Sequence, residues 1–343
     1  MNSDSMHDVL IVGAGIAGLI AATELQTQGK KVTLLDKGRL PGGRLATRYN
    51  EEGQPVFDYG AQFVTARDEW FAQQMKNWIE AKAAVEWGRG FSNQIGVPAK
   101  QNGYSRFRGY PGMQKIADHL AKNLNVRNNQ KVIKIEPENN FIQVQTDQDN
   151  LYTARHMILT MPVPQSLELL QKSRITLFSS DYKSLESIVY APCLAILATL
   201  QGPSGLPSPG ALHLQSEPID IISDNTQKFW NQPLEKETKT SKITIHAGPK
   251  FSEGCLDLKR EEINKTGKEL VPLALPYLAS PVSDFQTHFW RYARPVKLHP
   301  ERCFSVTVNQ SMLVFAGDAF FEPRVEGAAL SGKAAADLIL QNT

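Results

Sequence analysis

The residues best suited to chemistry near the N-terminus are three glycines in a GxGxxG run over residues 13–18. The run follows the apolar stretch Val9–Val12 and opens a segment with helical spacing. There the first glycine makes a tight turn, the second lets a pyrophosphate approach the backbone, and the third lets helix and strand pack closely. The helix N-terminus adds N–H donors and the positive end of its dipole. The predicted fingerprint residues are Gly13, Gly15, Ile16, Ala17 and Gly18.

An acidic residue, Asp36, follows the second apolar stretch, Val32–Leu35, where a carboxylate accepts a hydrogen bond from a ribose hydroxyl. A glycine turn with no ligand is the alternative interpretation. The combination of strand, helix and acidic residue favours a dinucleotide site. The fingerprint alone does not separate NAD from FAD.

Three further features favour FAD. Gly42, Gly43 and Arg44 suit a second phosphate, although a basic surface loop is the other interpretation. Gly317 and Asp318 end an apolar strand, where an acceptor can bind a ribityl chain. Small residues then open a helix against whose N-terminus a flat ring can lie, and its dipole would stabilise a reduced flavin. That last motif contains Glu326, Gly327 and Ala328.

The elements that position these residues form a β-α-β unit near the N-terminus, with a right-handed crossover between parallel strands. An amphipathic helix is expected over 113–124, a hairpin over 132–146, and a strand over 156–159. The stretch 312–316 is another buried strand, and 327–340 is a helix rich in small residues. Between 40 and 60 the chain shows no clear periodicity.

The middle of the chain has a different sequence pattern. We expect strands of a mostly antiparallel sheet at 195–200, 219–222, 243–246 and 285–290. The predicted fold is α/β: a Rossmann-type FAD-binding domain with a parallel sheet and β-meander, plus an inserted, mostly antiparallel α+β substrate domain, similar to p-hydroxybenzoate hydroxylase. The cofactor domain is expected at 1–67, 104–163 and 292–343. The substrate domain is expected at 68–103 and 164–291.

The overall composition excludes some functional classes. The 343 residues carry 37 Lys plus Arg against 35 Asp plus Glu, which gives no argument for nucleic acid or an anionic membrane as a partner. Three widely spaced cysteines and the lack of a CxxC motif argue against a metal site. The polar start at 1–7 and the short apolar run after it predict neither a signal peptide nor a membrane span, so we expect a cytoplasmic protein.

Four motifs together resemble the renalase-like flavoproteins of the flavin amine oxidase superfamily. They are DxGAQxxT at 58–65, GGR at 42–44, WRxxxP at 290–295 and GD…RVEGAxLSG at 317–332. The resemblance runs through nearly the whole chain in order and is weakest between 164 and 242. The first and third motifs are its more specific part.

This resemblance implies a set of site residues. The fingerprint glycines, the GGR motif and the C-terminal motif would contact FAD, together with Asp36, Lys37 and Val132. Gly60, Ala61, Gln62 and Phe63 would run beside the isoalloxazine ring. His246 and Trp290 would face the ring from the substrate domain. Without the resemblance, a histidine satisfied within a sheet is the favoured interpretation of His246, and Trp290 is equally a core or a pocket residue. No cysteine follows Cys303, so we expect FAD to bind non-covalently.

The chemistry implied by the resemblance is oxidation of NAD(P)H isomers, reduced at the nicotinamide 2- or 6-position, to NAD(P)⁺. The substrate passes a hydride to the flavin, and O₂ is reduced to H₂O₂. Trp290 and Phe63 would form an aromatic wall, and His246, Gln62 and Tyr59 would hold the carboxamide. Because a dihydropyridine regains aromaticity on oxidation, no general base is required.

Two other functions stay open on the sequence. One is a flavin amine oxidase or a desaturase-type enzyme of the same superfamily, although the short insert of mixed polarity disfavours both. The other is an NADP(H)-binding flavoprotein with little turnover, because residues for binding and for turnover would coincide.

Overall fold

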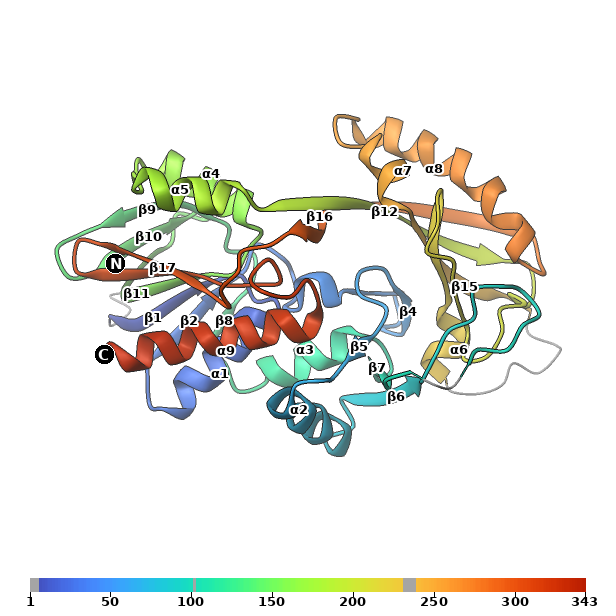
Figure 1. Cartoon of the computed structure of the whole chain (residues 1–343), viewed down its shortest axis with the longest axis horizontal. Helices are drawn as coiled ribbons and strands as arrows, with labels where there is room; N and C mark the ends of the chain where they lie inside the picture. The colour runs from blue at the N-terminus through green and yellow to red at the C-terminus, as the bar shows by residue number, and fades with distance from the viewer. Residues whose placement is uncertain (1–5, 101–102, 231–238) are drawn as a thin grey trace. The chain divides into compact units, whose positions relative to one another are not determined.

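The computed structural model describes residues 6–100, 103–230 and 239–343, and the chain divides into two compact units (Figure 1). Unit 1 comprises residues 1–43, 117–189 and 295–343, and unit 2 comprises 44–116 and 190–294. The first part of the predicted N-terminal segment, residues 1–5, lies outside the described residues. The boundaries predicted for the cofactor and substrate domains stay a prediction.

Unit 1 is built on an eight-stranded sheet whose main path runs β17-β18-β11-β1-β2-β8, with β9 and β10 extending it through β11. β1, β2, β11 and β18 run parallel, whereas β9, β10 and β17 pair antiparallel. The strands are β1 (His7–Val12), β2 (Val32–Leu35), β8 (Val126–Arg127), β9 (Val132–Pro137), β10 (Ile142–Thr146), β11 (Leu151–Leu159), β17 (Phe304–Val308) and β18 (Ser311–Phe315).

The carboxyl ends of four parallel strands are in register at one edge of this sheet. Val12 pairs with Leu35 on one side and with Leu159 on the other, and Leu159 pairs with Phe315. The predicted glycine turns at 13 and 317 follow within two residues of two of these strands. The first and the last segment of unit 1 in the sequence therefore meet at this edge of the sheet. It is the edge at which α/β sheets bind their ligands.

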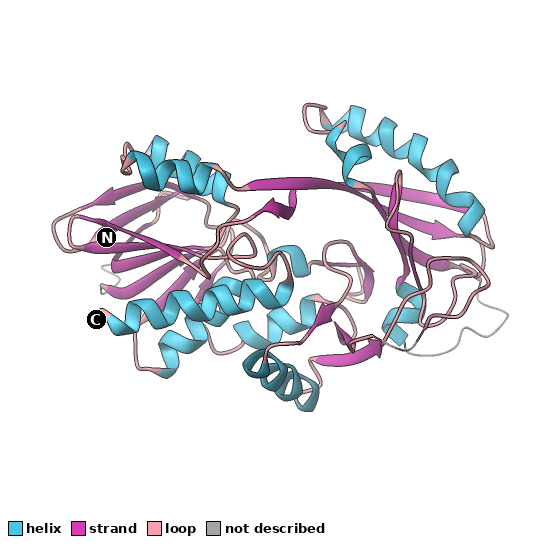
Figure 2. Ribbon diagram, viewed as in Figure 1, coloured by secondary structure: helices cyan, strands magenta, loops and turns pink. Residues whose placement is uncertain are grey.

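Two helices cover one face of the sheet side by side, α1 (Ile16–Thr27) and α9 (Val325–Gln341) (Figure 2). They approach so closely at Gly332 that a Cβ there would lie 2.1 Å from the Ala17 carbonyl oxygen. The small residues of α9 thus serve close packing. The other helices of unit 1 are α4 (Val163–Lys172), which packs on β9, and α5 (Ser179–Glu186).

Unit 2 contains a five-stranded sheet of order β13-β14-β15-β12-β16, in which β13, β14, β15 and β12 pair antiparallel as predicted. Strands β12 and β16 are longer than predicted, because they extend beyond the segments in which apolar and polar residues clearly alternate. These strands are β12 (Val189–Leu200), β13 (Ala211–His213), β14 (Ile219–Asp224), β15 (Ser241–Ala247) and β16 (Val282–Lys297).

The two faces of the five-stranded sheet differ in chemistry. Leu194, Ile196, Ile222 and Ile245 belong to an apolar core that also includes Leu270 of α8 (Arg260–Ala274). Because side chains alternate along a strand, the intervening residues lie on the opposite face. This second face, called the polar face below, carries Cys193, His213, His246, His288 and Trp290.

The glycine-rich stretch after residue 40 is more regular than expected. It contains a one-turn η1 helix (Gly43–Leu45) and a hairpin of β3 and β4, and a small sheet of order β5-β7-β6 follows. The remaining elements are β3 (Thr47–Tyr49), β4 (Pro55–Asp58), β5 (Val64–Thr65), α2 (Glu69–Glu80), β6 (Ala84–Gly88), β7 (Arg106–Gly109), α3 (Gln114–Ala121), α6 (Asn225–Trp230), α7 (Pro249–Glu253) and η2 (Leu275–Tyr277).

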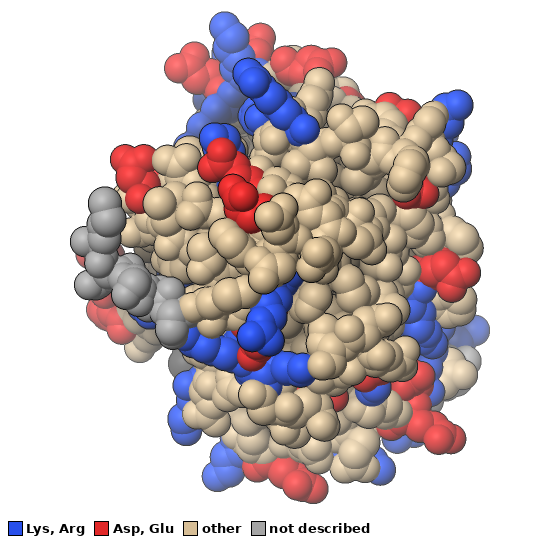
Figure 3. Space-filling view, turned by 90° about the vertical axis from the view of Figure 1, so that its left-hand side faces the viewer, with Lys and Arg blue, Asp and Glu red and all other residues tan. Residues whose placement is uncertain are grey.

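Among the described residues, no helix is both long and apolar enough to cross a membrane, and no group of His, Cys, Asp or Glu could hold a metal ion. Basic and acidic side chains are interspersed on the face drawn in Figure 3.

Candidate functional site

The fingerprint glycines lie in the turn between β1 and α1, as predicted. Gly13 has φ +106°, and a Cβ at Gly18 would lie 2.0 Å from the Gly13 carbonyl oxygen. Gly18 is therefore needed for helix and strand to approach each other. At Gly15, the N-cap of α1, a Cβ would meet nothing within 4 Å. Packing within the protein thus does not require this glycine, and the open space beside it suits a ligand.

Asp36 organises the same turn from the end of β2. Its carboxylate accepts hydrogen bonds from the Ala14 N–H and the Gly38 N–H, both at 2.6 Å. The predicted second glycine motif also lies here, because the Gly42 N–H donates to the Ala14 carbonyl at 2.7 Å and Gly15 pairs with Gly42 in an isolated bridge. Gly43 is in contact distance of Gly15.

Thr160, which sequence reasoning missed, connects the two glycine turns. Its hydroxyl donates to the Gly13 carbonyl at 2.9 Å, and its own carbonyl oxygen lies 3.8 Å from the Cβ position of Gly317. Gly317 has φ +146°, and its N–H donates to the Ser331 hydroxyl on α9 at 2.8 Å. The residue directly after β11 was the available signal, since loops after parallel strands meet at one edge.

The structure places the other predicted FAD residues of unit 1 as follows. Lys37 is exposed beside Asp36, and Val132 is buried at the start of β9. Asp318 follows Gly317 after β18. Glu326, Gly327 and Ala328 are buried in the first turn of α9, whose N-cap has no side-chain hydrogen bond. At Gly327 a Cβ would lie 2.1 Å from the Glu322 carbonyl oxygen, so glycine is required there.

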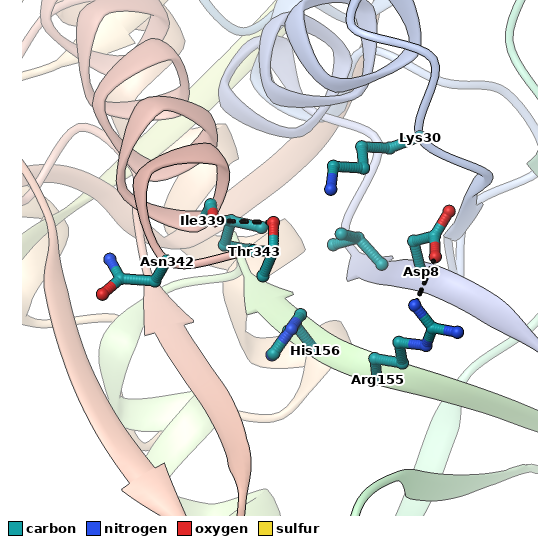
Figure 4. Close-up of a pocket in the computed structure, with 8 residues that line it drawn as sticks. Asp8, Lys30, Arg155, His156, Ile339, Asn342 and Thr343 are labelled. Carbon is teal, nitrogen blue, oxygen red and sulfur yellow. Dashed lines mark hydrogen bonds and ion pairs between the residues drawn. The ribbon is translucent and has the colours of Figure 1, made fainter.

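These features fit FAD. The N-termini of α1 and α9 are both uncapped by side chains, and open space lies beside Gly15. Unsatisfied N–H groups at a helix N-terminus bind phosphate well. A different hollow of about 270 Å³ lies at the other end of unit 1, among Asp8, Lys30, Arg155 and His156 (Figure 4). None of the predicted site residues lines it.

In unit 2, the loop after β4 carries Tyr59. Two of the predicted site residues contact its backbone carbonyl oxygen. The Trp290 indole Nε1–H donates to this oxygen at 2.7 Å, and His246 Nε2 lies 3.2 Å from it. A carbonyl oxygen can only accept, so His246 carries its proton on Nε2 when neutral, and its Nδ1 is an acceptor. Burial lowers the pKa of His246, which favours this neutral form.

Aromatic rings surround this carbonyl. The ring of Tyr59 stacks on Trp290 with centroids 5.5 Å apart and planes at 18°. His288 contacts both rings edge-on, at 4.8 Å from Tyr59 and 4.3 Å from Trp290. Burial, followed by the charges of Arg48 and Arg260, lowers the pKa of His288 to about 4. His288 was not predicted from the sequence, although its place two residues before Trp290 on one strand was a signal.

Gln62 and Phe63 do not join that aromatic group. The Gln62 amide is buried and donates to the carbonyls of Asp58 and Gly60, so this side chain stabilises its own loop. The Phe63 ring instead contacts Phe91, with centroids 5.2 Å apart. The predicted pairing of Phe63 with Trp290 in one wall is therefore not among the ring contacts of the described residues.

Arg44, Gly60 and Ala61 form the start of the same loop system. The Arg44 guanidinium donates to the carbonyls of Tyr292 and Ala293, so it holds the backbone of β16. The Ala61 N–H donates to the Arg44 carbonyl at 2.8 Å, and a Cβ at Gly60 would lie 2.1 Å from that oxygen. Gly60 thus permits this close approach, and Arg44 is less available for a phosphate than expected.

A buried ion pair supports the loop from beneath. Lys228 Nζ lies 2.8 Å from Asp58 Oδ2, 3.4 Å from Gln62 Oε1 and 4.8 Å from the centre of the Trp87 ring. Asp58 Oδ1 also accepts from the Thr47 hydroxyl and the Met113 N–H. Burial lowers the pKa of Lys228, while the Asp58 charge opposes that shift. No periodic pattern in the sequence predicted this ion pair.

Comparison with protein families gives two matches. Residues 11–77 match the NAD(P)-binding Rossmann-like domain, and residues 96–340 match the family of flavin containing amine oxidoreductases. Among curated relatives, hydroxyneurosporene desaturase of Rubrivivax gelatinosus is 42% identical over 80 residues, 23% of this chain and 14% of that protein. (S)-6-hydroxynicotine oxidase of Paenarthrobacter nicotinovorans is 30% identical over 118 residues, 34% of this chain and 27% of that protein. The matches thus span under a third of these relatives' length.

Solved structures resemble the whole chain. Cyclohexylamine oxidase from Brevibacterium oxydans IH-35A has a TM-score of 0.64 and 15% identity over 98% of this chain and 99% of that one. Wild-type putrescine oxidase bound to putrescine has a TM-score of 0.58 and 17% identity over the same shares. At such identities the likeness shows a common fold: a Rossmann-type domain with a parallel sheet and a separate antiparallel sheet domain. Because the second family match covers most of its length, the chain belongs to the family of flavin-containing amine oxidoreductases.

Proposed function

We propose that the protein is an FAD-dependent oxidoreductase that oxidises dihydronicotinamide dinucleotides, as renalase-like enzymes do. FAD is the cofactor expected of the family. The fingerprint glycines, Asp36, Lys37, Gly42, Gly43, Val132 and the C-terminal motif would hold it non-covalently. The segment from Gly60 to Phe63 would run beside its ring. When bound, FAD would take up the two electrons of the substrate and transfer them to O₂, giving H₂O₂.

The observation that carries the substrate proposal is the shared acceptor at Tyr59. Its carbonyl fixes Trp290 and His246 in one place, at 2.7 and 3.2 Å, and fixes the tautomer of His246. The Nδ1 lone pair of His246 then suits the N–H₂ group of a nicotinamide carboxamide. The indole of Trp290 and the ring of Tyr59 offer flat apolar surfaces for a planar substrate.

The histidines of this group are suited to positioning and are poor bases. Burial lowers the pKa of both His246 and His288, so neither takes up a proton readily at neutral pH. Lys228 is fully buried and its Nζ lies 2.8 Å from Asp58, so it is engaged in that pair. Such a site supports a reaction in which the substrate loses a hydride and regains aromaticity without a general base.

An amine oxidase is the second candidate, favoured by the stacked rings of Tyr59 and Trp290, which resemble one wall of a cage for an amine. One experiment separates the two. Purified protein would be loaded with FAD and mixed anaerobically in a stopped-flow instrument with 2-, 4- and 6-dihydro isomers of NADPH and with small amines. We expect flavin bleaching by the 2- or 6-dihydro isomers.

The other outcomes decide against the proposal. Bleaching by amines alone would establish the amine oxidase. Equal rates with the ordinary 4-dihydro isomer would indicate a general reductase. Tight NADP⁺ binding without bleaching by any isomer would indicate a dinucleotide-binding flavoprotein with little turnover. A folded protein that takes up no FAD would refute all of these functions.

A further inference from the structure

Arg106, at the start of β7, is held between two aromatic rings. Its guanidinium carbon lies 4.9 Å from the centre of the Phe91 ring and 5.6 Å from the centre of the Phe63 ring. A guanidinium over an aromatic face is attracted by the negative face of the ring, and its plane is restricted by stacking. The side chain therefore has a fixed position beside Phe63, the last residue of the segment proposed to run beside the flavin ring.

The hydrogen bonds of Arg106 are few for so well positioned a group. One terminal nitrogen donates to the Tyr104 carbonyl at 3.4 Å, and the buried Nε has no hydrogen-bond partner among the described residues. No acidic side chain of the described part of the chain forms an ion pair with it. Arginine carries five N–H donors, and buried donors without partners are costly. The guanidinium thus has free donors to offer a ligand.

The electrostatic surroundings of Arg106 are positive. Its pKa is lowered by burial and then by the charge of Arg67. The nearby carboxylate of Asp220 already faces His213, at 3.8 Å. His213 lies on the polar face, and its pKa is lowered by burial, raised by Asp220 and lowered again by Arg106 and Arg294. Arg106 and Arg294 thus both act on His213, and Arg67 acts on Arg106, so positive charges outnumber the one carboxylate among these interactions, which favours an incoming anion.

We propose that Arg106 is a substrate-binding residue that recognises a phosphate group of the dinucleotide, with Phe63 and Phe91 fixing its guanidinium. This inference rests on the proposed function, because it names the part of that substrate that the residue would bind. The planar pair of N–H donors matches two phosphate oxygens, and a phosphate supplies the negative charge that Arg67 and Arg106 together attract.

The test uses the FAD-loaded protein and its Arg106→Gln variant. Isothermal titration would measure binding of NADP⁺, of inorganic pyrophosphate, and of N-methylnicotinamide, which has no phosphate. We expect Arg106→Gln to weaken binding of the two phosphate compounds roughly 10- to 100-fold, as for loss of a charge-assisted hydrogen-bond pair. Binding of N-methylnicotinamide should not change. Arg89→Gln is the matched control, because Arg89 follows β6 of the same small sheet, is exposed and pairs with Glu86.

A conservative variant guards against misfolding. Arg106→Lys keeps a cation over both rings but cannot donate through a planar fork, so we expect it to retain the fold and to weaken NADP⁺ binding several-fold. NADP⁺ and pyrophosphate affinities that match the wild type in Arg106→Gln, or in Arg106→Lys if the first variant does not fold, would overturn the inference. They would show that Arg106 only braces the two phenylalanine rings.

The two proposals can fail separately. If dihydronicotinamides bleach the flavin in wild type and variant with equal KM, the function stands and the role of Arg106 is refuted. If no dihydronicotinamide bleaches the wild type, while pyrophosphate binds and the Arg106→Gln variant loses it, the phosphate site stands and the proposed reaction is refuted.

Discussion

Lys228 and Asp58 form an ion pair with Nζ and Oδ2 2.8 Å apart and with neither side chain exposed to solvent. The pair joins helix α6 to the end of β4, directly before the loop that carries Tyr59. Asp58 also anchors the backbone of Met113 and the hydroxyl of Thr47. A single carboxylate therefore fixes three segments that are distant in the sequence.

Replacing Lys228 by Met should destabilise the protein strongly. The variant leaves the Asp58 charge buried without its partner, which costs about 3–5 kcal/mol. Urea unfolding monitored by tryptophan fluorescence would measure the change. The control is Lys172→Met, because Lys172 pairs with Glu168 on an exposed helix, where the expected change is below about 0.5 kcal/mol. Equal stabilities of the two variants would show that the buried pair contributes little.

The glycine turn offers a test of FAD binding that separates it from folding. Gly15→Ala should keep the fold, because a Cβ there meets no protein atom within 4 Å and φ is −71°. It should nevertheless weaken FAD binding by about tenfold or more, since the methyl group fills the space beside the helix N-terminus. Gly18→Ala should destabilise the apoprotein itself, because its Cβ would clash with the Gly13 carbonyl. The Kd of FAD and the Tm of the apoprotein measure the two effects.

The finding that would contradict this interpretation is unchanged FAD affinity in a folded Gly15→Ala protein. FAD should also be released intact by acid precipitation, because we expect non-covalent binding. A flavin that stays with the precipitated chain would show that expectation to be wrong.

Stability should fall in mild acid. The pKa of His246 is lowered in the folded state from an ordinary value near 6.5. The pKa of His288 is lowered from the same value to about 4. The unfolded chain therefore binds protons first as the pH drops, so stabilisation present above pH 6.5 is lost between about 6.5 and 4. The pH dependence of unfolding should be flatter in His288→Gln and His246→Gln. A wild-type slope that neither variant changes would exclude these histidines as its source.

Trp290→Phe should slow flavin reduction by the substrate roughly tenfold. The variant retains a ring for stacking on Tyr59 but loses the indole donor to the Tyr59 carbonyl, a hydrogen bond of 2.7 Å. Anaerobic stopped-flow absorbance measures the rate. Phe178→Leu, which changes an aromatic residue that is 81% exposed, should behave like the wild type. A Trp290→Phe rate equal to that of the wild type would remove the positioning role.

The sequence was sufficient to predict the elements whose signals are local. The run Val9–Val12, the glycines after it and the periodic helix beyond them predicted β1, the turn and α1, because each depends on neighbouring residues. The antiparallel middle sheet was also confirmed, since alternation marks a strand wherever it pairs. The hairpin β3–β4 was missed because Thr47–Tyr49 is too short to show alternation.

The site was less accessible to prediction, because its contacts join residues far apart in the chain. Tyr59 was predicted for its side chain, yet its backbone carbonyl holds Trp290 and His246, and no sequence pattern identifies a carbonyl acceptor. The amide of Gln62 is used within its own loop for a similar reason. Burial of Lys228 and Arg106 depends on α6 and on two rings that are not adjacent in sequence, so charge counting places both on the surface.

The arrangement of β18 and α9 affects how the protein is made in the cell. Both belong to unit 1, yet the ribosome synthesises them after every segment of unit 2. Helix α9 packs closely on α1 where Gly332 meets Ala17, and β18 pairs with β11, the neighbour of the strand that ends before Gly13. During translation, the early β-α-β segment therefore lacks β18 and α9 until the last part of the chain is made. If FAD binds at this edge as proposed, its capture would be a late event that follows the synthesis of α9.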